Sequence, residues 1–228
     1  MQDNKIRHLA IAMDGNVRWA KREGLTKMEG HKHGAENAKK LLPIVSKLAI
    51  PYLTLYSFSY ENWKRSESEV SYLLELLSHY LKYEVSSLIK NGVKLKVIGN
   101  LSKLSSSLRA EIDKVMKATE NNTKITLCIA FSYGGRQEIV DACQKVIDSG
   151  IDKITEEEFK NYMYDSEMPD VDLLIRTSGV FRISNFLLWQ SAYSELYFLD
   201  KFWPEFTEAD LVEAISDYSR RKRNFGAR

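Results

Sequence analysis

Short apolar runs alternate with longer stretches of helical periodicity along the whole chain. The runs with strand-like lengths are His8–Met13, Tyr52–Phe58, Val93–Ile98, Ile125–Phe131 and Val171–Ile175, with a weaker sixth at Glu195–Phe198. The stretches long enough for helices are roughly His31–Leu48, Glu67–Lys90, Lys103–Glu120, Gly135–Ser149 and Glu208–Asn224. Strands separated by helical crossovers are typical of a parallel sheet with helices on its faces. The pattern therefore predicts an α/β fold with a mostly parallel central sheet of about six strands, flanked by helices.

The predicted helix Glu67–Lys90 has the clearest pattern. Ser66 and Glu69 have the spacing of a capping box at its start, and Asn91-Gly92 is a left-handed stop at its end. Its apolar side chains recur at three- and four-residue steps and form one stripe: Val70, Leu73, Leu74, Leu77, Leu81, Val85 and Leu88. Such a stripe usually covers a sheet, but it can also line a cavity for a long apolar ligand. Periodicity alone leaves both interpretations open.

Composition indicates one domain and no general affinity for nucleic acid. The chain has 228 residues, of which 44% are hydrophobic and 28% charged, and no repeat or low-complexity tract divides it, so we predict a single domain over residues 1–228. Its 33 Lys and Arg against 31 Asp and Glu leave a net charge of +2. This balance gives no electrostatic case for nucleic-acid binding, and the short basic run Arg220–Arg223 is typical of a solvated helix face.

The cysteines, the histidines and the N-terminus exclude further classes. Cys128 and Cys143 form no C-x-x-C pair, and the four histidines form no zinc-protease motif, so we predict neither a disulfide framework nor a zinc site. Residues 1–8 lack the apolar core of a signal peptide. No segment reaches the ~20 uninterrupted apolar residues that a spanning helix needs. We expect a soluble, cytoplasmic protein.

Polar residues with unusual chemistry follow the first two predicted strands, and ligands bind beyond the carboxyl ends of strands in an open α/β sheet. Asp14-Gly15-Asn16 leads into a short helix whose N–H groups can face an anion, although a plain Asx turn explains it equally well. A second cluster, Gly30–Gly34, places His31 in the first turn of the next helix, with Lys27 upstream. The run Ser59–Arg65 is polar, aromatic and basic, which indicates a mobile functional loop, since a solvated connection leaves Trp63 unexplained.

The fifth strand ends in Arg176-Thr177-Ser178-Gly179, with Arg182 and Ser184 shortly after. Two guanidinium groups and a hydroxyl around a Gly turn can clamp a diphosphate. A carboxylate at Glu195 could join Asp14 in holding a divalent cation, because Mg²⁺ prefers oxygen ligands together with substrate phosphates. There is no G-x-x-x-x-G-K-[ST] loop and no G-x-G-x-x-G fingerprint. The residues alone therefore predict a metal-assisted diphosphate site on an α/β scaffold.

With these motifs in place, the chain resembles the cis-prenyltransferases, and in particular the bacterial undecaprenyl diphosphate synthases, from Ile6 to Gly226. The resemblance rests on several motifs in the right order: M-D-G-N-x-R-W-A at 13–20, G-H at 30–31, S-x-E-N-W-x-R at 59–65, Y-G-G-R at 133–136, R-T-S-G-x-x-R-I-S-N-F-L-L-W-Q at 176–190, A-Y-S-E-L-Y-F at 192–198 and W-P at 203–204. Any one of them is weak evidence, but together they are specific.

The resemblance implies an activity and a set of partners. The enzyme would add isopentenyl diphosphate sequentially to an allylic diphosphate, usually farnesyl diphosphate, with Mg²⁺ and with each new double bond cis. The product would be a long-chain polyprenyl diphosphate, undecaprenyl diphosphate by similarity, which is the lipid carrier precursor for peptidoglycan synthesis. The apolar stripe would then line a tunnel for the growing chain. The resemblance also implies a homodimer, with residues 219–228 near the interface, and transient contact with a membrane surface for product release.

The resemblance also assigns roles to residues. Asp14 would be the catalytic acidic residue that handles Mg²⁺ and diphosphate, and Glu195 would help to hold the metal. Asn62 matches a residue labelled as proton acceptor, but an uncharged amide is a weak base, and a diphosphate oxygen is the alternative. The allylic diphosphate would contact Gly15, Asn16, Val17, Arg18, Trp19, Lys27 and His31. Isopentenyl diphosphate would contact Arg176, Arg182, Ile183 and Ser184. The closing loop would add the substrate-binding residues Ser59, Tyr60, Glu61, Trp63 and Arg65 to Asn62.

Some positions depart from the family pattern. Val17 stands where Gly is usual, Lys27 replaces an Arg and loses its bidentate fork, and Val180 replaces a Glu. None of these changes removes Asp14 or the paired arginines, so the chain does not match a non-catalytic partner subunit, which would be expected to lose parts of the site. An all-helical trans-type prenyltransferase is excluded, because the chain has no D-D-x-x-D motif.

Overall fold

One parallel sheet organises the structure, a computed structural model that describes residues 5–223. Within these residues six strands lie in the order β3-β4-β2-β1-β5-β6, and every neighbouring pair is parallel. The strands are β1 (His8–Ala12), β2 (Tyr52–Ser59), β3 (Val93–Ile98), β4 (Ile125–Tyr133), β5 (Leu173–Arg176) and β6 (Glu195–Phe198). The predicted single-domain α/β fold is confirmed, and its sheet is entirely parallel.

All five predicted long helices are present, together with two short ones. The helices are α1 (Asn16–Arg22), α2 (Lys27–Lys47), α3 (Glu67–Lys90), α4 (Ser106–Thr119), α5 (Gly135–Asp148), α6 (Glu156–Phe159) and α7 (Glu208–Arg220). Helix α2 begins four residues before the predicted His31, because Thr26 and Glu29 form a capping box there. Helix α7 ends at Arg220, whereas the predicted range extends to Asn224, which lies outside the described residues.

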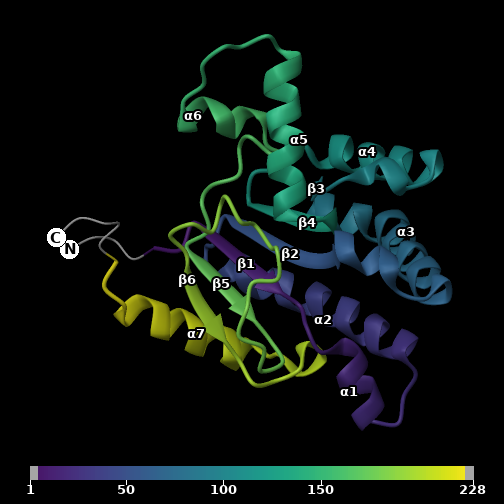
Figure 1. The fold of residues 1–228 in the computed structure, drawn as a ribbon. Coiled ribbons are helices and arrows are strands. Elements are labelled where there is room, and N and C mark those ends of the chain that lie inside the picture. The colour runs from purple at the N-terminus through teal and green to yellow at the C-terminus, as the bar shows by residue number, and fades with distance from the viewer. Residues whose placement is uncertain (1–4, 224–228) are drawn as a thin grey trace.

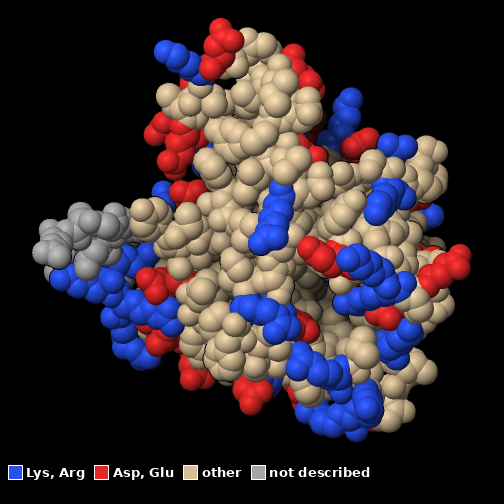
Figure 2. Space-filling model, viewed as in Figure 1, with Lys and Arg blue, Asp and Glu red and all other residues tan. Residues whose placement is uncertain are grey.

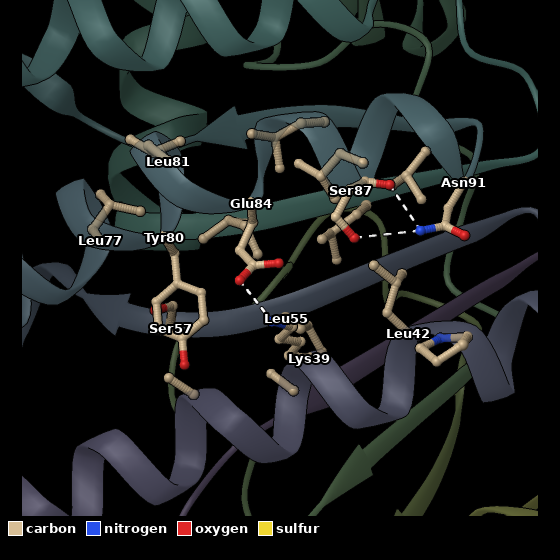
Figure 3. A pocket seen from close by; sticks show the side chains of 18 of the residues that line it. Lys39, Leu42, Leu55, Ser57, Leu77, Tyr80, Leu81, Glu84, Ser87 and Asn91 are labelled. Atoms are coloured by element: carbon tan, nitrogen blue, oxygen red, sulfur yellow. Dashed lines mark hydrogen bonds and ion pairs between the residues drawn. The ribbon is translucent and has the colours of Figure 1, made fainter.

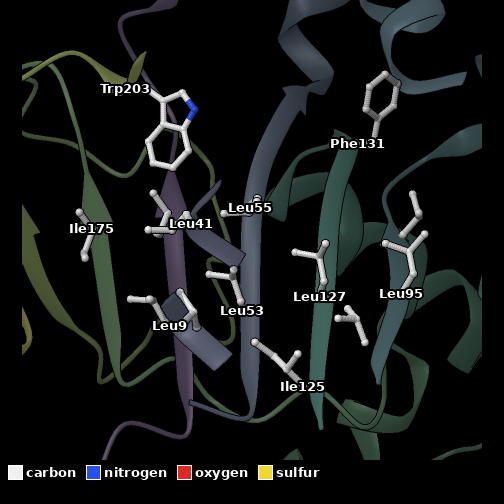
Figure 4. Close-up of a cluster of buried hydrophobic side chains, with 14 of the residues drawn as sticks. Leu9, Leu41, Leu53, Leu55, Leu95, Ile125, Leu127, Phe131, Ile175 and Trp203 are labelled. Carbon is white, nitrogen blue, oxygen red and sulfur yellow. The ribbon is translucent and has the colours of Figure 1, made fainter. Parts of the chain in front are cut away.

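The two faces of the sheet carry different side chains, because successive residues of a strand point to opposite sides. Leu9 and Ile11 of β1 point into the larger cluster, which packs against α2, α3, α4 and α7 (Figures 1 and 4). Ala10 and Ala12 point into a smaller cluster, which is completed by side chains from the segment between α6 and β6. Helices α2 and α3 therefore lie on the same face of the sheet.

The carboxyl ends of the strands meet at one edge of the sheet. Ala12 of β1 is level with Tyr56 of β2 on one side and with Arg176 of β5 on the other. The residues that follow β1, β2 and β5 are therefore brought together, although β5 lies more than a hundred positions after the other two strands in the chain. None of the helices within residues 5–223 has both the length and the hydrophobicity needed to span a bilayer.

Candidate active site

Asp14 and Arg176 lie side by side at the carboxyl edge of the sheet. The Arg176 Nη2 donates to Asp14 Oδ2 at 2.9 Å, and the Arg18 Nη2 lies 3.4 Å from Asp14 Oδ1. Burial opposes ionisation of Asp14, but the hydrogen bond and charge of Arg176, together with the charge of Arg18, outweigh it and lower the pKa below its ordinary 3.8. Asp14 is therefore an anion at neutral pH, held between two guanidinium groups.

The loop after β5 fixes the position of Asp14. The Asp14 backbone N–H donates to Thr177 Oγ1 at 3.0 Å, and the same hydroxyl donates to the Asp14 carbonyl at 2.7 Å. Thr177 is fully buried. The Arg18 side chain donates to the Ser178 hydroxyl and, at 3.3 Å, to the Ser178 carbonyl. These contacts tie the start of α1 to the end of β5.

Arg176 also organises the turn that follows it. Its Nη1 donates to Ser184 Oγ at 2.7 Å and to the Arg182 carbonyl at 2.6 Å, and Arg182 Nε donates to Ser184 Oγ at 3.2 Å. Ser184 has a φ of 49°, which is left-handed. Residues other than glycine that adopt this conformation are common at functional sites. The buried Arg176 Nε has no hydrogen-bond partner among the described residues. Arg176 thus keeps a donor for an anionic ligand.

Helix α1 approaches α2 more closely than side chains would allow. A Cβ on Gly30 would lie 2.4 Å from the Asn16 carbonyl oxygen, and a Cβ on Gly34 would lie 2.3 Å from Asn16 Oδ1. Gly15 caps α1 with a φ of 107°, a value that favours glycine. The glycines of the predicted Gly30–Gly34 cluster therefore act in packing, and they hold α1 with its first residues facing the site.

Glu69 is the centre of a second cluster, in which three basic side chains contact its carboxylate. Its carboxylate pairs with Lys27 Nζ at 3.1 Å, with His31 Nε2 at 3.2 Å and with Arg65 Nη1 at 2.8 Å. Burial lowers the pKa of His31, although the Glu69 carboxylate acts in the opposite direction. Burial works against the charge of Glu69, but bonds from Lys27 and His31 and the charge of Arg65 lower its pKa. A single buried carboxylate thus holds three residues that were predicted to bind a diphosphate.

The same cluster corrects the predicted capping box. Ser66 is the N-cap of α3, but its side chain makes no capping hydrogen bond, and Glu69 turns to the basic side chains instead. The Ser66 hydroxyl accepts a hydrogen bond from Lys27 Nζ at 2.9 Å. The capping prediction was wrong, because two basic side chains of α2 and one from the segment before α3 compete for the Glu69 carboxylate.

The predicted loop Ser59–Arg65 contains a short 3-10 helix, Tyr60–Lys64. Asn62 Oδ1 accepts a hydrogen bond from the backbone N–H three residues earlier, at 3.1 Å. Glu61 Oε1 accepts one from Asn185 Nδ2 at 2.9 Å, across the site. The segment is therefore tied to the turn after β5 in this conformation.

Trp63, which a solvated loop would leave unexplained, anchors this segment. Its Nε1 donates to Ser132 Oγ at 2.9 Å, and its ring meets the Phe58 ring edge-on at 5.1 Å between centroids. Lys103 Nζ lies 4.6 Å from the Tyr60 ring centroid and 5.7 Å from that of Trp63. The two aromatic side chains therefore fix the 3-10 helix against β4 and the segment before α4.

A polar cavity of about 520 Å³ lies between these groups. Nine of the predicted site residues line it: Asp14, Asn16, His31, Ser59, Glu61, Asn62, Arg65, Arg176 and Ser184. Five further residues complete the lining: Ala12, Met13, Tyr56, Ser57 and Asn185. Its lining brings the guanidinium groups of Arg65 and Arg176 next to the carboxylates of Asp14 and Glu61. On the surface, Lys and Arg gather over α1 and beside the end of α7 (Figure 2).

An apolar cavity of about 460 Å³ begins where the polar one ends. Met13 and Ser57 line both cavities. The apolar cavity runs between α2 and α3 over the strands, with Leu77 and Leu81 on one side and Leu42 on the other (Figure 3). Protein interiors seldom keep voids larger than a water molecule, so a space of this size is a feature of a ligand site. The stripe on α3 thus has both predicted uses, since Val70 packs in the core while Leu77 lines the cavity.

The remaining predicted residues lie outside the cavity lining: Gly15, Val17, Arg18, Trp19, Lys27, Tyr60, Trp63, Arg182, Ile183 and Glu195. Arg18, Lys27 and Arg182 are nevertheless bonded to groups at its edge, through Ser178, Glu69 and Ser184. Trp19 packs on the ring of His33, with 4.8 Å between the centroids.

Glu195 is not brought next to Asp14 within the chain. It is level with Leu173 at the start of β5, and Leu173 is level with Leu9 of β1, five residues before Asp14. At a rise of ~3.3 Å per residue, these levels are about 16 Å apart along the strands. The Glu195 carboxylate pairs with Arg221 Nη1 at 2.8 Å. Within residues 5–223, no group of three or more His, Cys, Asp and Glu side chains could hold a metal ion.

Sequence reasoning missed Glu69, Thr177, Ser178 and Asn185. Thr177, Ser178 and Asn185 stand inside the motif at 176–190, next to residues that were chosen for their charge. Neutral side chains that orient those charges give no signal of their own in a single sequence. Glu69 was concealed by its spacing from Ser66.

The chain is similar to known proteins over nearly its whole length. The family model described as "Putative undecaprenyl diphosphate synthase" matches residues 12–226. An isoprenyl transferase of Rickettsia felis is 62% identical over 98% of this chain and 95% of its own length, and one of Fusobacterium nucleatum is 49% identical over 99% and 98%.

Two solved structures share the fold. Lavandulyl diphosphate synthase from Lavandula x intermedia, in complex with dimethylallyl diphosphate, has a TM-score of 0.93 and 36% identity over 98% of this chain and 99% of its own. A probable undecaprenyl diphosphate synthase from Campylobacter jejuni has a TM-score of 0.84 and 33% identity over 98% and 100%. These matches, together with a polar cavity that contains two arginines and adjoins an apolar one, show that the chain belongs to the undecaprenyl diphosphate synthase family of prenyltransferases.

Proposed function

We propose that this prenyltransferase condenses isopentenyl diphosphate repeatedly onto farnesyl diphosphate and makes a long-chain cis-polyprenyl diphosphate, undecaprenyl diphosphate. The observation that carries the proposal is the junction of the two cavities at Met13 and Ser57. A diphosphate head among the cations leaves its hydrocarbon tail facing the apolar cavity. The lavandulyl diphosphate synthase, crystallised with dimethylallyl diphosphate, supports an allylic diphosphate as one substrate, and the apolar cavity supports a product with a long tail.

The two diphosphates are proposed to bind on opposite sides of Asp14. Asn16, His31 and Arg65 line the side formed by α1, α2 and the 3-10 helix, which suits the allylic diphosphate. Arg176 and Ser184 line the side formed by the turn after β5, which suits isopentenyl diphosphate. The N–H groups at the start of α1 contribute a short favourable dipole to the first side. This arrangement holds the two reacting carbons in one small space and lowers the entropic part of the barrier.

In the proposed reaction the allylic C–O bond breaks, the alkene of isopentenyl diphosphate bonds to the allylic carbon, and a proton is then lost. The cations stabilise the charge that develops on the departing diphosphate. Asn62 faces the cavity but is an uncharged amide that already accepts a backbone hydrogen bond. We assign the proton to a diphosphate oxygen and assign to Asn62 the orientation of the substrates. Closure of the 3-10 helix over the substrates would exclude water from the cationic centre.

Mg²⁺ fits the chemistry of Asp14, the exposed part of whose carboxylate faces the polar cavity. Magnesium is commonly bound by one or two carboxylates together with substrate phosphates, so Asp14 and the diphosphates are a sufficient set without Glu195. When bound, the ion would neutralise charge on the leaving diphosphate.

We further propose a homodimer, a cytoplasmic location, a role of the product in peptidoglycan synthesis and transient contact with a membrane. Of the interface tail 219–228, residues 224–228 lie outside the described residues.

The test is incubation with farnesyl diphosphate, radiolabelled isopentenyl diphosphate and Mg²⁺, followed by chain-length analysis. We expect a long-chain product whose formation stops when the metal is chelated. Asp14→Ala should lower turnover by at least ~10²-fold, as the loss of a preorganised charge does elsewhere, with an unchanged circular dichroism spectrum. Asp113→Ala, on the exposed face of α4, is the matched control. Full turnover in Asp14→Ala would remove the mechanism, and a monomer in light scattering would remove the homodimer.

A further inference from the structure

An ion pair interrupts the apolar lining of the cavity between α2 and α3. Lys39 Nζ of α2 lies 2.6 Å from Glu84 Oε1 of α3, and both side chains line the cavity (Figure 3). The Lys39 side chain is 57% exposed and that of Glu84 is 23% exposed. Because the strands form the floor of the cavity, an exposed pair that joins the two helices lies across its solvent side.

Among the described residues, ion pairs join α2 and α3 at two levels. The first is the Glu69 cluster at the helix starts, and the second is Lys39–Glu84. Glu84 is 15 residues after Glu69, which is about 22 Å along α3 at 1.5 Å per residue. The Glu69 cluster lies where the diphosphate head would bind. The Lys39–Glu84 pair lies further along the cavity, where the hydrocarbon tail would pass.

At the far end of the cavity, polar groups stand among the apolar side chains of Pro43, Leu88 and Val93. Ser46, Ser87, Asn91 and Lys124 line it there. The Asn91 amide nitrogen donates to the Ser87 carbonyl at 2.8 Å and to its hydroxyl at 3.3 Å, whereas the buried Ser46 hydroxyl has no partner among the described residues. A hydrocarbon tail gains little by pressing against these groups, and the sheet blocks the way inward. The remaining way out is sideways, between α2 and α3.

We propose that Lys39 and Glu84 form a clasp that closes the side of this channel, so that the polar far end limits the length of the chain as long as the clasp is shut. The inference rests on the proposed chain elongation. An exposed ion pair contributes little free energy, whereas each methylene group removed from water contributes appreciably. The Lys39 methylene groups can also cover apolar surface while the ammonium stays in water. The clasp is thus strong enough to contain a short tail and weak enough to be parted.

The test compares product lengths from the wild type and from Lys39→Met/Glu84→Gln, which keeps the side-chain sizes and removes both charges. We expect the mean product to lengthen by at least one five-carbon unit with a broader distribution. The charge-swapped variant Lys39→Glu/Glu84→Lys should restore the wild-type distribution. Lys82→Met is the matched control, because the Lys82–Glu111 pair, at 3.1 Å and with similar exposure, joins α3 to α4 instead. An unchanged or shortened distribution in the double variant would overturn the clasp.

A second measurement is independent of turnover. In a Cys143→Ser background, which removes the exposed cysteine, a Ser46→Cys thiol should react with a bulky maleimide at least threefold faster when the clasp is removed. Equal rates overturn the clasp even if products change. If no variant and no wild type incorporates isopentenyl diphosphate, the proposed function fails, and the thiol rates alone decide whether the pair closes the channel.

Discussion

Replacing Glu69 by Gln tests whether the cation cluster is held ready for a diphosphate. The carboxylate pairs with Lys27, His31 and Arg65 at distances of 2.8–3.2 Å. His31 and Arg65 also line the polar cavity. Glutamine keeps the size of the side chain but removes its charge, so the three basic groups lose their common partner while their positions stay the same.

The expected size of the effect follows from burial. Hydrogen bonds to a charged group contribute ~1.5–3 kcal/mol. Lys27 and Arg65 are each 37% exposed, so solvent screens their part, and we expect Glu69→Gln to lower the free energy of unfolding by about 1–2 kcal/mol. For a domain of this length that is a fall in Tm of about 2–8 °C.

Inorganic diphosphate should reverse the loss, because its oxygens can take the place of the carboxylate. The assay is thermal unfolding with and without diphosphate, for wild type, Glu69→Gln and Glu67→Gln. Glu67 is exposed in the same first turn of α3 and controls for the helix dipole. We expect a larger rise in Tm with diphosphate in Glu69→Gln than in wild type, with Glu67→Gln equal to wild type. Equal rises in all three proteins would show that Glu69 does not compete with a diphosphate for these cations.

Two further predictions concern packing and pH. Gly34→Ala places a Cβ 2.3 Å from Asn16 Oδ1. We therefore expect the free energy of unfolding to fall by about 1–3 kcal/mol, and calorimetry to show weaker binding of diphosphate. Burial, opposed by the Pro169 carbonyl and Asp172, lowers the pKa of His8 from 6.5 to about 4. As the pH falls, the His8 imidazole is protonated at a higher pH in the unfolded chain than in the folded protein. The free energy of unfolding therefore falls by about 3 kcal/mol between pH 6.5 and pH 4. Denaturant unfolding should show a smaller fall over that window in His8→Gln, and equal slopes would contradict the assignment.

Two segments with the same local pattern show where sequence reasoning stops. Thr26 and Glu29 have capping-box spacing and do cap α2, where the Glu29 carboxylate binds the Thr26 N–H and hydroxyl. Ser66 and Glu69 have the same spacing, and Glu69 leaves the cap for three basic side chains from elsewhere in the fold. The local sequence allows both caps. Tertiary contacts decide between them, and a single sequence does not contain those contacts.

Topology explains which site residues could be predicted. The carboxyl ends of parallel strands lie at one edge, so Asp14 and Arg176 could be placed at the same edge from the alternation of strands and helices. That they are neighbours depends on the pairing of β1 with β5, which the structure shows. Glu195 begins its strand, and the start of a parallel strand lies at the opposite edge. The sequence motif brought Glu195 into the predicted metal site, and the register removes it from that place within one copy of the chain.

The same topology explains why one geometry can serve many rounds of condensation. Each crossover helix starts near the carboxyl edge of the sheet and runs back along it, so α2 and α3 both begin at the cations and enclose the apolar cavity along their length. The cavity of about 460 Å³ has a largely apolar lining, so burial of a prenyl tail there would be favourable at every length that the cavity accepts. In the proposed reaction the head group would return to the same charges after each addition, and only the tail would move further between the helices. On the proposed function, the far end and the side of the channel, where Lys39 and Glu84 meet, would set the number of additions, while the chemistry at Asp14 would be the same in every round.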